Sequence, residues 1–288
     1  MNLQTITSLA DPRIALYANM RDAELAQRED PLDARAHAGV FIAEGELVVR
    51  RLASSRFRTQ SILTTPTRLR TLDDLAAQLP SDTPIYLAEQ EVLNQIVGFN
   101  MHRGVLAIGE RTGSDDLESL LARTGPVIVL EDLTNHDNLG GVFRNAAALG
   151  GAGVWVLLSP RCADPLYRKS LRVSMGLALS VPYARAADTE WPGVLDRLRG
   201  AGYAAWAMTP RDGSVGMREA VAGRSGSGGS GNVALVLGSE GPGLTEACIR
   251  ACDRAVCIEM DKADEAVDSL NVAMAAGIAL YALGRGVP

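Results

Sequence analysis

VALVLGSEGPGL, residues Val233–Leu244, joins five consecutive apolar residues to a turn that holds three glycines and a proline. A short apolar run that ends in such a turn is typical of a buried strand and its following loop in an α/β protein. The turn has neither the Lys-Ser/Thr of a phosphate-binding P-loop nor the G-x-G-x-x-G spacing of a dinucleotide fingerprint. Because glycine lets the backbone approach a ligand or another segment closely, we expect a tightly packed loop around its one acid, Glu240.

AVDSLNVAMAAGIALYALG, residues Ala266–Gly284, predicts a helix near the end of the chain. Ser269 is placed to cap its N-terminus, and Asp268 adds negative charge where the helix dipole favours it. Large apolar residues recur at helical spacing among small ones: Leu270, Met274, Ile278 and Tyr281. A helix with so little bulk can pack closely against another helix, and its N-terminus presents free N–H groups to a ligand.

Strands and helices alternate through most of the chain, which is typical of α/β architecture. Residues 13–28 predict a polar helix after a turn at Asp11–Pro12. Up to residue 110, the predicted strands are 40–43, 61–65, 84–88 and 103–110, and the predicted helices are 46–53 and 89–99. These elements predict a small N-terminal α/β domain, followed by a linker with a short helix at residues 111–125.

From residue 126 onward, the pattern predicts a second domain with a parallel sheet and helices on both faces. Strand 126–133, a helix from about residue 140 to 149 and strand 154–158 form a βαβ unit. After the segment SVPYA (180–184), later strands are expected at 203–208, 233–238 and 255–260, with helices at 189–202 and 244–253. The Gly/Ser-rich stretch 223–232 predicts a surface loop, whose role the residues do not indicate.

Ligands of parallel α/β sheets bind at the carboxyl ends of the strands, which here selects the loops 135–138, 238–243 and 259–269. The polar residues in and after these loops are Asn138, Arg144, Glu240, Ser269 and Asn271. They form no Ser-His-Asp or Cys-His arrangement, so hydrolase chemistry is poorly supported. For His102 and His136, a structural role is favoured over catalysis.

The composition is that of a soluble globular protein, with 47% hydrophobic and 22% charged residues. No apolar run reaches the roughly 20 residues that a membrane helix needs. The N-terminus has no basic start before an apolar core, so we expect a cytoplasmic protein without a signal peptide. Its four cysteines make no disulfide framework in a chain of this length. Cys248 and Cys252 can share a helix face, but buried apolar cysteines are favoured over a metal site.

Residues 50–70 carry six arginines and no acid, although the whole chain has a net charge of −6. The six are Arg50, Arg51, Arg56, Arg58, Arg68 and Arg70. Such a run is either a phosphate-contacting surface for a nucleic acid or a solvated face with scattered arginines.

Three blocks of this chain together resemble the motifs of a known family. NLGGVFRNAAALG (138–150), GSEGPGL (238–244) and SLNVAMAAGIALY (269–281) are similar, in the same order, to those of the SpoU-type RNA ribose 2′-O-methyltransferases, within the SPOUT class. RVSMG (172–176), with Pro182, also matches the segment between the first two motifs. The N-terminal part, from 41 to 107, is similar to the L30e-like substrate-binding domain that precedes many such catalytic domains.

This resemblance covers nearly the whole chain and implies a fold, a reaction and partners. It implies an RNA-binding domain at 1–110, a linker at 111–125 and a SPOUT methyltransferase domain with a trefoil knot at 126–288. It further implies S-adenosylmethionine bound in the knot, an RNA substrate and a homodimer with active sites near the dimer interface. The sequence rules alone would not predict a knot, because knots are nearly absent from proteins.

Carried over by motif position, the catalytic set is Asn138, Arg144, Glu240, Ser269 and Asn271. The expected cofactor contacts, largely through the backbone, are Gly238, Gly243, Ile258, Met260 and Leu270. The family's proposed base is the arginine, but a guanidinium has a pKa above about 12. Arg144 is therefore expected either to deprotonate the ribose 2′-hydroxyl or to hold it together with an RNA phosphate. Ser269 and Asn271 would hydrogen-bond around it, while Glu240 and Asn138 brace the loops.

The chain departs from the family pattern before its third motif. Glu259 stands where the family usually has proline, and the turn after it is longer and acidic, with Asp261, Asp264 and Glu265. Ile258 directly precedes this departure. Two rival functions stay open, an RNA-binding protein with little catalysis and a SPOUT enzyme that methylates a base. Ribosomal RNA is favoured over transfer RNA by family analogy only, and the residues indicate neither the nucleotide nor a role in antibiotic resistance.

Overall fold

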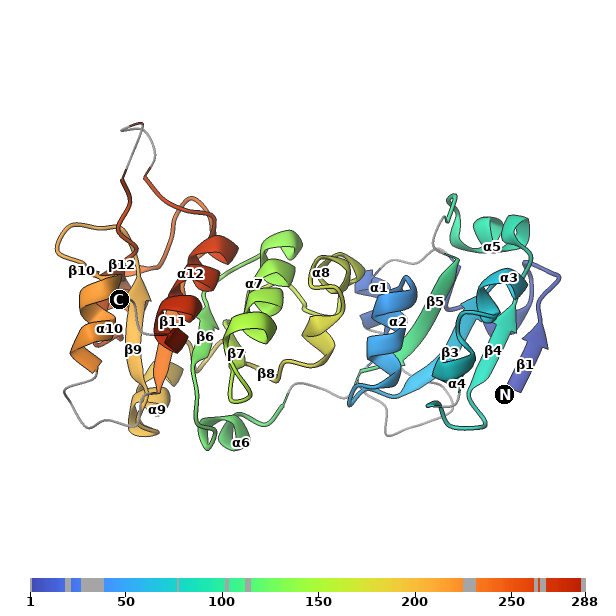
Figure 1. Cartoon of the computed structure of the whole chain (residues 1–288), viewed down its shortest axis with the longest axis horizontal. Coiled ribbons are helices and arrows are strands. Elements are labelled where there is room, and N and C mark those ends of the chain that lie inside the picture. Colours follow the sequence, from blue (N-terminus) through green and yellow to red (C-terminus); the bar gives the residue numbers. More distant parts are fainter. Residues whose placement is uncertain are drawn as a thin grey trace. The chain divides into compact units, whose positions relative to one another are not determined.

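The computed structural model describes residues 2–18, 22–26, 39–76, 78–101, 104–111, 115–224, 232–261, 264 and 268–285. The chain divides into two compact units, and each has its own sheet (Figure 1). Unit 1 comprises Met1–Gly113 with Leu166–Ser180, and unit 2 comprises Ser114–Pro165 with Val181–Pro288. The sequence predicted two contiguous domains, 1–110 and 126–288. In the structure, the segment 166–180, which lies inside the second predicted range, groups with unit 1.

Unit 1 is built on a mixed five-stranded sheet, in the order β1-β4-β3-β5-β2. Its strands are β1 (Asn2–Thr5), β2 (Val40–Glu44), β3 (Thr59–Thr64), β4 (Pro84–Leu87) and β5 (Val105–Glu110). Its helices are η1 (Pro12–Ile14), α1 (Asp22–Ala26), α2 (Glu46–Ala53), α3 (Pro66–Leu69), α4 (Asp73–Ala76), α5 (Gln90–Val97), α8 (Arg168–Val173) and η2 (Leu177–Leu179). The α/β pattern predicted for 40–110 is confirmed, including the end of α5 at Gly98, whose φ of 82° suits glycine.

The continuous helix predicted for residues 13–28 is wrong over its first part. Asp11 caps only a short 3₁₀ turn, because its side chain accepts a hydrogen bond from the Arg13 backbone N–H at 3.0 Å. Ile14 and Tyr17 are fully buried, so tertiary packing rather than helix periodicity sets the path of this segment. The structure places α1 at Asp22–Ala26, while residues 27 and 28 lie outside its described part.

The segment that contains RVSMG packs on α2 of unit 1. The Arg51 guanidinium donates to the backbone carbonyl of Met175. Gly176 has a φ of 81°, and a Cβ atom there would lie 3.3 Å from the Val48 Cα atom. Glycine is needed at this contact because both the φ angle and the space disfavour a side chain.

Unit 2 has a seven-stranded sheet, in the order β10-β12-β9-β11-β6-β7-β8, and all its pairings are parallel. Its strands are β6 (Val127–Leu130), β7 (Trp155–Leu158), β8 (Tyr183–Arg185), β9 (Ala204–Met208), β10 (Val215–Gly216), β11 (Val233–Leu237) and β12 (Arg254–Cys257). Its helices are α6 (Leu117–Leu121), α7 (His136–Leu149), α9 (Val194–Gly200), α10 (Met217–Arg224), α11 (Glu246–Arg250) and α12 (Val272–Arg285). The predicted parallel α/β sheet is confirmed; the trefoil knot stays a prediction.

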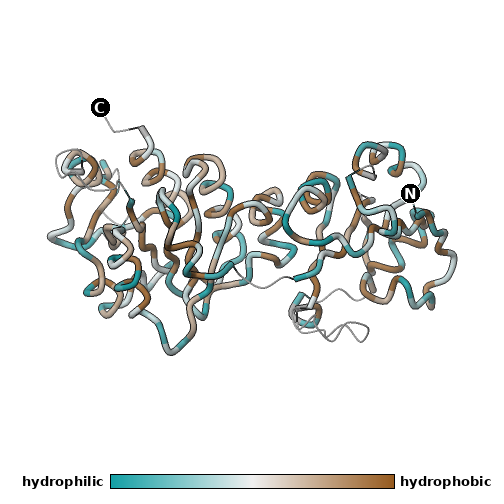
Figure 2. Tube along the Cα trace, turned by 90° about the horizontal axis from the view of Figure 1, so that it is seen from below, coloured by the Kyte–Doolittle hydropathy of each residue, from teal (hydrophilic) through white to brown (hydrophobic). Residues whose placement is uncertain are grey.

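The core of unit 2 follows from the apolar strands, which run as hydrophobic stretches through the tube of Figure 2. One buried cluster joins strand residues such as Val127 and Trp155 to Leu120 of α6, Leu195 of α9 and Cys248 of α11. Helices α7 and α12 pack on one another through small residues. A Cβ atom on Gly141 would lie 2.8 Å from the Ala273 Cβ, so the predicted close packing of the final helix is observed.

Two predicted helix starts are wrong, and in both cases an asparagine cap decides the start. Helix α7 begins at His136 rather than at about residue 140, because Asn135 Oδ1 accepts from the backbone N–H of Asp137 at 2.8 Å. Helix α12 begins at Val272, and its cap is Asn271 rather than Ser269. Asn138 therefore lies in the first turn of a helix instead of in the loop before it.

Candidate active site

A cavity of about 710 Å³ lies in unit 2, at the carboxyl ends of β9, β11 and β12. Its walls come from Met208–Arg211, Leu237–Leu244 and Asp268–Val272. The other wall residues are Ile249 of α11, Ala275 of α12, and Val256, Ile258 and Met260 at the end of β12. All five predicted cofactor contacts are in its wall, as are Glu240, Ser269 and Asn271. The volume is in the range of small-molecule sites in proteins, which span roughly 300–1,000 Å³.

The loop Gly238–Leu244 keeps its shape through close backbone contacts. The backbone N–H of Gly243 donates to the Ser239 carbonyl at 3.1 Å. A Cβ atom on Gly238 would lie 2.2 Å from the carbonyl carbon of Gly243, so no other residue fits at this position. The glycines of this motif therefore let the loop fold back on itself beside the cavity.

Asn271 connects the three motif segments through one side chain. Its Oδ1 accepts from the backbone N–H groups of Ala273 at 3.0 Å and Met274 at 3.3 Å, which caps α12. Its Nδ2 donates to Asn138 Oδ1 and to Glu240 Oε1, both at 2.9 Å. Asn138 is only 7% exposed, so this contact fixes the buried start of α7 against the rim of the cavity.

Ser269 and Arg144 are placed differently from these three residues. The Ser269 hydroxyl donates to Asp268 Oδ1 at 2.8 Å, and both residues line the cavity. Arg144 is exposed on α7, does not line the cavity and has no hydrogen-bond or ion-pair partner among the described residues. The structure thus brings Asn138, Glu240 and Asn271 into contact, with Ser269 beside the same cavity, and leaves the Arg144 guanidinium in solvent.

Glu259, which replaces the family's proline, holds the start of α10. Its carboxylate accepts from the backbone N–H groups of Met217 at 3.2 Å and Arg218 at 3.4 Å. Its neighbours Ile258 and Met260 both line the cavity. Because alternate residues of an extended chain point to opposite sides, a fixed Glu259 is compatible with both neighbours facing the cavity. Most of the acidic turn after it lies outside the described residues.

A fourth loop contributes to the cavity and was not among the three predicted. Thr209, Pro210 and Arg211 follow β9, which lies between β11 and β12 in the sheet. Arg211 Nη1 lies 3.2 Å from Glu246 Oε2 in a two-pronged ion pair, and this pair raises the pKa of Arg211. The signal in the sequence was the strand itself, since any parallel strand in the middle of the sheet ends at this edge.

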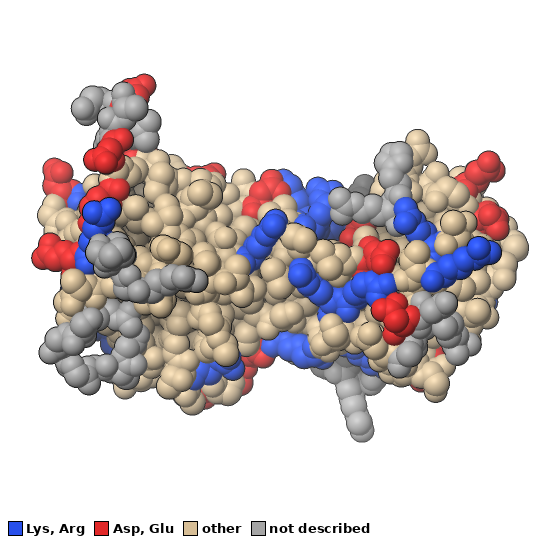
Figure 3. All heavy atoms as spheres, viewed as in Figure 1, with Lys and Arg blue, Asp and Glu red and all other residues tan. Residues whose placement is uncertain are grey.

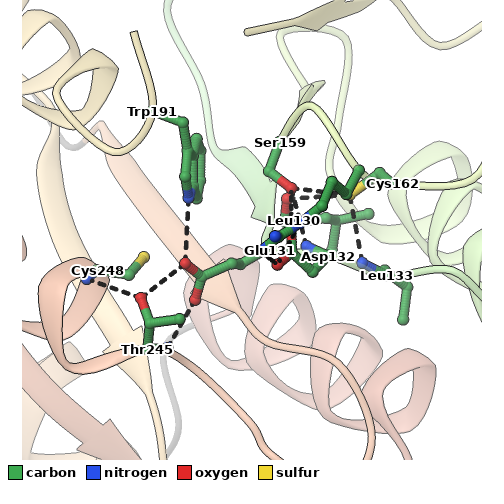
Figure 4. Close-up of polar contacts among 10 residues, drawn as sticks. Leu130, Glu131, Asp132, Leu133, Ser159, Cys162, Trp191, Thr245 and Cys248 are labelled. Carbon is green, nitrogen blue, oxygen red and sulfur yellow. Dashed lines mark hydrogen bonds and ion pairs between the residues drawn. The ribbon is translucent and has the colours of Figure 1, made fainter. Parts of the chain in front are cut away.

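The turn that leads from β6 to Asn138 is cross-linked to the end of β7 (Figure 4). The backbone N–H of Asp132 donates to Ser159 Oγ at 2.8 Å, and that hydroxyl donates to Asp132 Oδ1 at 2.9 Å. The Arg161 guanidinium, with its Nε 3.1 Å from Asp132 Oδ2, lowers the pKa of this carboxyl. Asp132 has a φ of 53°, which is unusual for a residue other than glycine. The contacts with Ser159 and Arg161 stabilise this backbone conformation.

The arginines of residues 50–70 are partly paired with acids from outside that window. Arg50 lies 3.0 Å from Glu46 and 2.7 Å from Asp74, and Arg58 lies 3.2 Å from Glu110. Arg51 donates to Met175, and the Arg56 guanidinium lies 4.8 Å from the centre of the Phe57 ring. Arg68 and Arg70 are exposed. Figure 3 shows basic side chains gathered over α2 and α3 of unit 1 with acidic ones among them, and RNA contact there stays a prediction.

The other candidates from the sequence are the histidines, the cysteines and the Gly/Ser-rich loop. None of the described helices is long and apolar enough to cross a membrane. Within the described ranges, no group of three or more His, Cys, Asp or Glu residues is arranged to hold a metal ion. Cys248 is fully buried, and its pKa is raised by the neighbouring Cys252 and by burial. His136 is the first residue of α7, His102 lies outside the described residues, and the loop 223–232 is described only at its two ends.

Comparisons with known proteins agree on one family. The model of the SpoU rRNA methylase family matches residues 125–281. An uncharacterised tRNA/rRNA methyltransferase of Mycobacterium bovis is 40% identical over 282 residues, which cover 98% of this chain and 91% of that protein. A protein of the same description from Mycobacterium tuberculosis has the same identity and coverage.

Solved structures show the same fold. An rRNA methyltransferase from Sinorhizobium meliloti is similar with a TM-score of 0.74 and 23% identity, over 99% of both chains. The SpoU methyltransferase AviRb from Streptomyces viridochromogenes is similar with a TM-score of 0.69 and 24% identity, over 92% of this chain and 95% of that one. The resemblance of the three motifs is thereby confirmed, and this chain belongs to the SpoU rRNA methylase family.

Proposed function

We propose that this protein transfers a methyl group from S-adenosylmethionine to a ribose 2′-hydroxyl of structured RNA, with ribosomal RNA preferred over transfer RNA. The observation that carries the proposal is the side chain of Asn271, which joins Asn138 and Glu240 at the rim of the cavity. Methyl transfer needs loops that are held firmly in place, because the attacking oxygen must lie in line with the bond to the leaving sulfur, and these contacts fix the three motif segments.

The cavity suits S-adenosylmethionine in size and chemistry. Leu244, Ile249 and Val256 give it apolar wall for a flat base, and the backbone of the loop Gly238–Leu244 can approach closely. The carboxylates of Glu240 and Asp268 are at the wall, where they favour a cation. When bound, the cofactor supplies an electrophilic methyl on a cationic sulfonium. Solved structures similar to this chain include an AdoMet-bound rRNA methyltransferase and AviRb in complex with AdoMet.

Ribose as the acceptor is supported by the spacing of the first motif, N-x-G-x-x-x-R from Asn138 to Arg144. Arg144 lies on the same helix as Asn138, and its exposed guanidinium has no partner in the described part of the chain. A guanidinium can donate two parallel hydrogen bonds, to an RNA phosphate and to the hydroxyl beside it. Arg144 would in this way position the 2′-oxygen beside the Ser269 hydroxyl. The Asn271 amide already uses both its N–H donors and its oxygen within the protein, so it would hold the motif segments in place instead. One similar structure, at 24% identity and a TM-score of 0.67, is described as an RNA 2′-O ribose methyltransferase.

A homodimer is supported by an exposed apolar stripe on α12. Met274 is 59% exposed and Tyr281 55% exposed, and they lie at helical spacing with Ile278. Contiguous apolar surface of this kind is typical of protein–protein interfaces. We propose that a second copy of the chain covers the stripe, next to the helix that carries Arg144.

RNA contact by unit 1 is supported mainly by Arg68 and Arg70, which are exposed. Arg50 and Arg58 are less available, because acids already neutralise them. A substrate of ribosomal or transfer RNA would place the reaction in the cytoplasm.

The test is methyl transfer from labelled S-adenosylmethionine to unmodified ribosomal RNA and, separately, to transfer RNA, followed by digestion to nucleosides. A labelled 2′-O-methylnucleoside supports the proposal, and the RNA that carries it identifies the substrate class. A base-methylated nucleoside would instead establish a base methyltransferase. Cofactor binding and RNA binding without label in any RNA would favour the RNA-binding protein.

A matched pair of glycine variants tests the cavity itself. Gly238→Ala places a Cβ atom 2.2 Å from the Gly243 backbone, so cofactor binding should be lost. Gly200→Ala meets nothing within 4 Å and should bind the cofactor like the wild type. Equal affinity of both variants would overturn the assignment of the cavity to S-adenosylmethionine.

A further inference from the structure

Glu131 is a buried acid outside the cavity wall that no step of the proposed reaction uses. It follows the last residue of β6 and is 2% exposed. Its Oε2 accepts from the Thr245 backbone N–H at 2.8 Å, and its Oε1 accepts from the Thr245 hydroxyl at 2.8 Å. The Trp191 indole N–H also donates to Oε1, at 3.1 Å (Figure 4). Three neutral donors thus converge on one carboxylate.

The main chain of Glu131 makes a further contact that defines its position. Its backbone N–H donates to the carbonyl of Leu237 at 2.9 Å. Leu237 comes directly before the loop Gly238–Leu244, and Thr245 comes directly after it. One residue therefore closes both ends of the cavity loop, through its main chain at the first end and through its side chain at the second.

Thr245 passes this constraint into α11. Its hydroxyl oxygen accepts from the Cys248 backbone N–H at 3.2 Å, which makes Thr245 the N-cap of that helix. The hydroxyl thus donates to Glu131 and accepts from Cys248 at the same time. Because its proton and one of its lone pairs are used, the Thr245 side chain has a favoured orientation.

Burying a carboxylate at such a position costs free energy, because neutral hydrogen-bond donors must replace its water of hydration. A protein with an apolar side chain of similar volume at such a position is often as stable as one with the charged group, or more stable. What a carboxylate provides, and an apolar or amide side chain does not, is acceptor capacity on both oxygens without a donor of its own.

We infer that Glu131 is a positioning residue for the cofactor: by joining Leu237 and Thr245 it sets the shape of the loop Gly238–Leu244 and so the affinity for S-adenosylmethionine. The inference rests on the proposed assignment of the cavity to that cofactor. Glu131 acts through Thr245 and touches neither cofactor nor RNA, so its loss changes cofactor binding and not the transfer step.

The test is the substitution Glu131→Gln in the full chain. The amide has nearly the same shape but turns an N–H₂ group toward one of the donors, whichever way it is oriented. We expect the Kd for S-adenosylmethionine, measured by calorimetry, to rise roughly tenfold, which is about 1.4 kcal/mol. The rate at saturating cofactor and the KM for RNA should stay within about twofold of the wild type.

Three further variants separate positioning from general stability. Thr245→Val keeps the backbone donor but removes the hydroxyl, so its Kd should rise as well, and Thr245→Ser should restore the wild-type value. Trp191→Phe removes the one described donor to Glu131 that does not come from Thr245, so it should lower the melting temperature and leave the Kd unchanged. A merely structural role of Glu131 predicts lower melting temperatures for Glu131→Gln and Trp191→Phe and an unchanged Kd for both, which would overturn the inference.

The outcomes are distinguishable from a failure of the proposed function. If the wild type binds S-adenosylmethionine and Gly238→Ala does not, the cavity assignment stands. Wild-type Kd values for Glu131→Gln and Thr245→Val would then overturn the positioning role alone. If Glu131→Gln does not fold, Thr245→Val with its Thr245→Ser control decides the inference.

Discussion

The Nδ2 atom of Asn271 lies 2.9 Å from the Oδ1 atom of Asn138, although 133 positions separate the two residues in the chain. Asn271 caps α12, and Asn138 is in the first turn of α7, so the contact joins the starts of two helices that pack on each other. The same Nδ2 atom also donates to Glu240 on the cavity loop. This side chain therefore combines a structural role at a helix end with a connecting role at the proposed active site.

Substitutions of Asn271 should separate these two roles. Asp and Ser both cap helices well. The free energy of unfolding of Asn271→Asp and of Asn271→Ser should therefore stay within about 1 kcal/mol of the wild-type value. Neither can donate as the amide does to both partners, and we expect methyl transfer to fall by roughly a hundredfold because the loops lose their register. Thermal unfolding and labelled methyl transfer measure the two effects. Full activity in either variant would contradict the connecting role.

Arg144 should be needed for the reaction and not for the fold. Its side chain is exposed and unpaired among the described residues, so Arg144→Ala should change the free energy of unfolding by no more than about 0.5 kcal/mol. Transfer should drop by roughly 10²–10³-fold, the effect of removing a positioned donor at a reacting oxygen. Arg144→Lys should restore little, since an ammonium lacks the planar pair of donors. Retained turnover in Arg144→Ala, with an unchanged Kd for S-adenosylmethionine, would exclude the proposed role.

Glu259 should contribute to both stability and cofactor affinity. Glu259→Ala removes the acceptor for the backbone N–H groups of Met217 and Arg218, and losing such a cap costs about 1 kcal/mol. Because Ile258 and Met260 line the cavity, the Kd for S-adenosylmethionine should rise several-fold. Glu219→Ala is the matched control, since it removes an acid from the first turn of the same helix without touching the cavity. Equal effects of the two substitutions would mean that only helix charge matters.

The Asp132–Arg161 pair should make stability depend on acid pH. The Arg161 guanidinium, as hydrogen-bond donor, lowers the pKa of Asp132 from an ordinary value of about 3.9. A carboxyl with a lowered folded pKa contributes stability above its unfolded pKa, and this contribution is lost as the pH falls through the folded value. The melting temperature of Arg161→Ala should therefore be lower than that of the wild type at pH 7. The two melting temperatures should approach each other as the pH falls below about 4. The control Arg218→Ala, an exposed arginine without an ion pair among the described residues, should show no such convergence in calorimetric scans.

Local patterns were enough to predict most strands and helices and two of the loops that line the cavity, 238–243 and 259–269. Apolar runs such as Val233–Leu237 bury on both faces of a parallel sheet, so their composition alone identifies them. The glycines of the loop after it are required by the backbone contact between Gly238 and Gly243. The five cofactor contacts implied by the family resemblance are all in the cavity wall, since residues at the carboxyl ends of parallel strands meet at one edge.

Helix starts and charge pairing, by contrast, depended on contacts that no local window contains. The sequence predicted Ser269 as the cap of the final helix, whereas in the fold Asn271 makes the capping contacts and the helix starts after it. Arg50 has no acid in the stretch 50–70, yet Asp74 and Glu46 neutralise it in the fold. Ion pairing depends on distance in space, and distances in space are set only when the elements pack.

The sequence by itself determined that this protein is an α/β protein with three motifs and a loop at the edge of a parallel sheet. Buried strands require runs of apolar residues, and close approach of the backbone requires glycine, so both features can be read from residues that are neighbours in the chain. The tertiary structure alone decided that Asn271 joins Asn138 to Glu240, and that Glu131 closes the cavity loop at both ends. A hydrogen bond requires two groups within about 3 Å of each other. For residues more than a hundred positions apart, the packing of the whole sheet determines that distance.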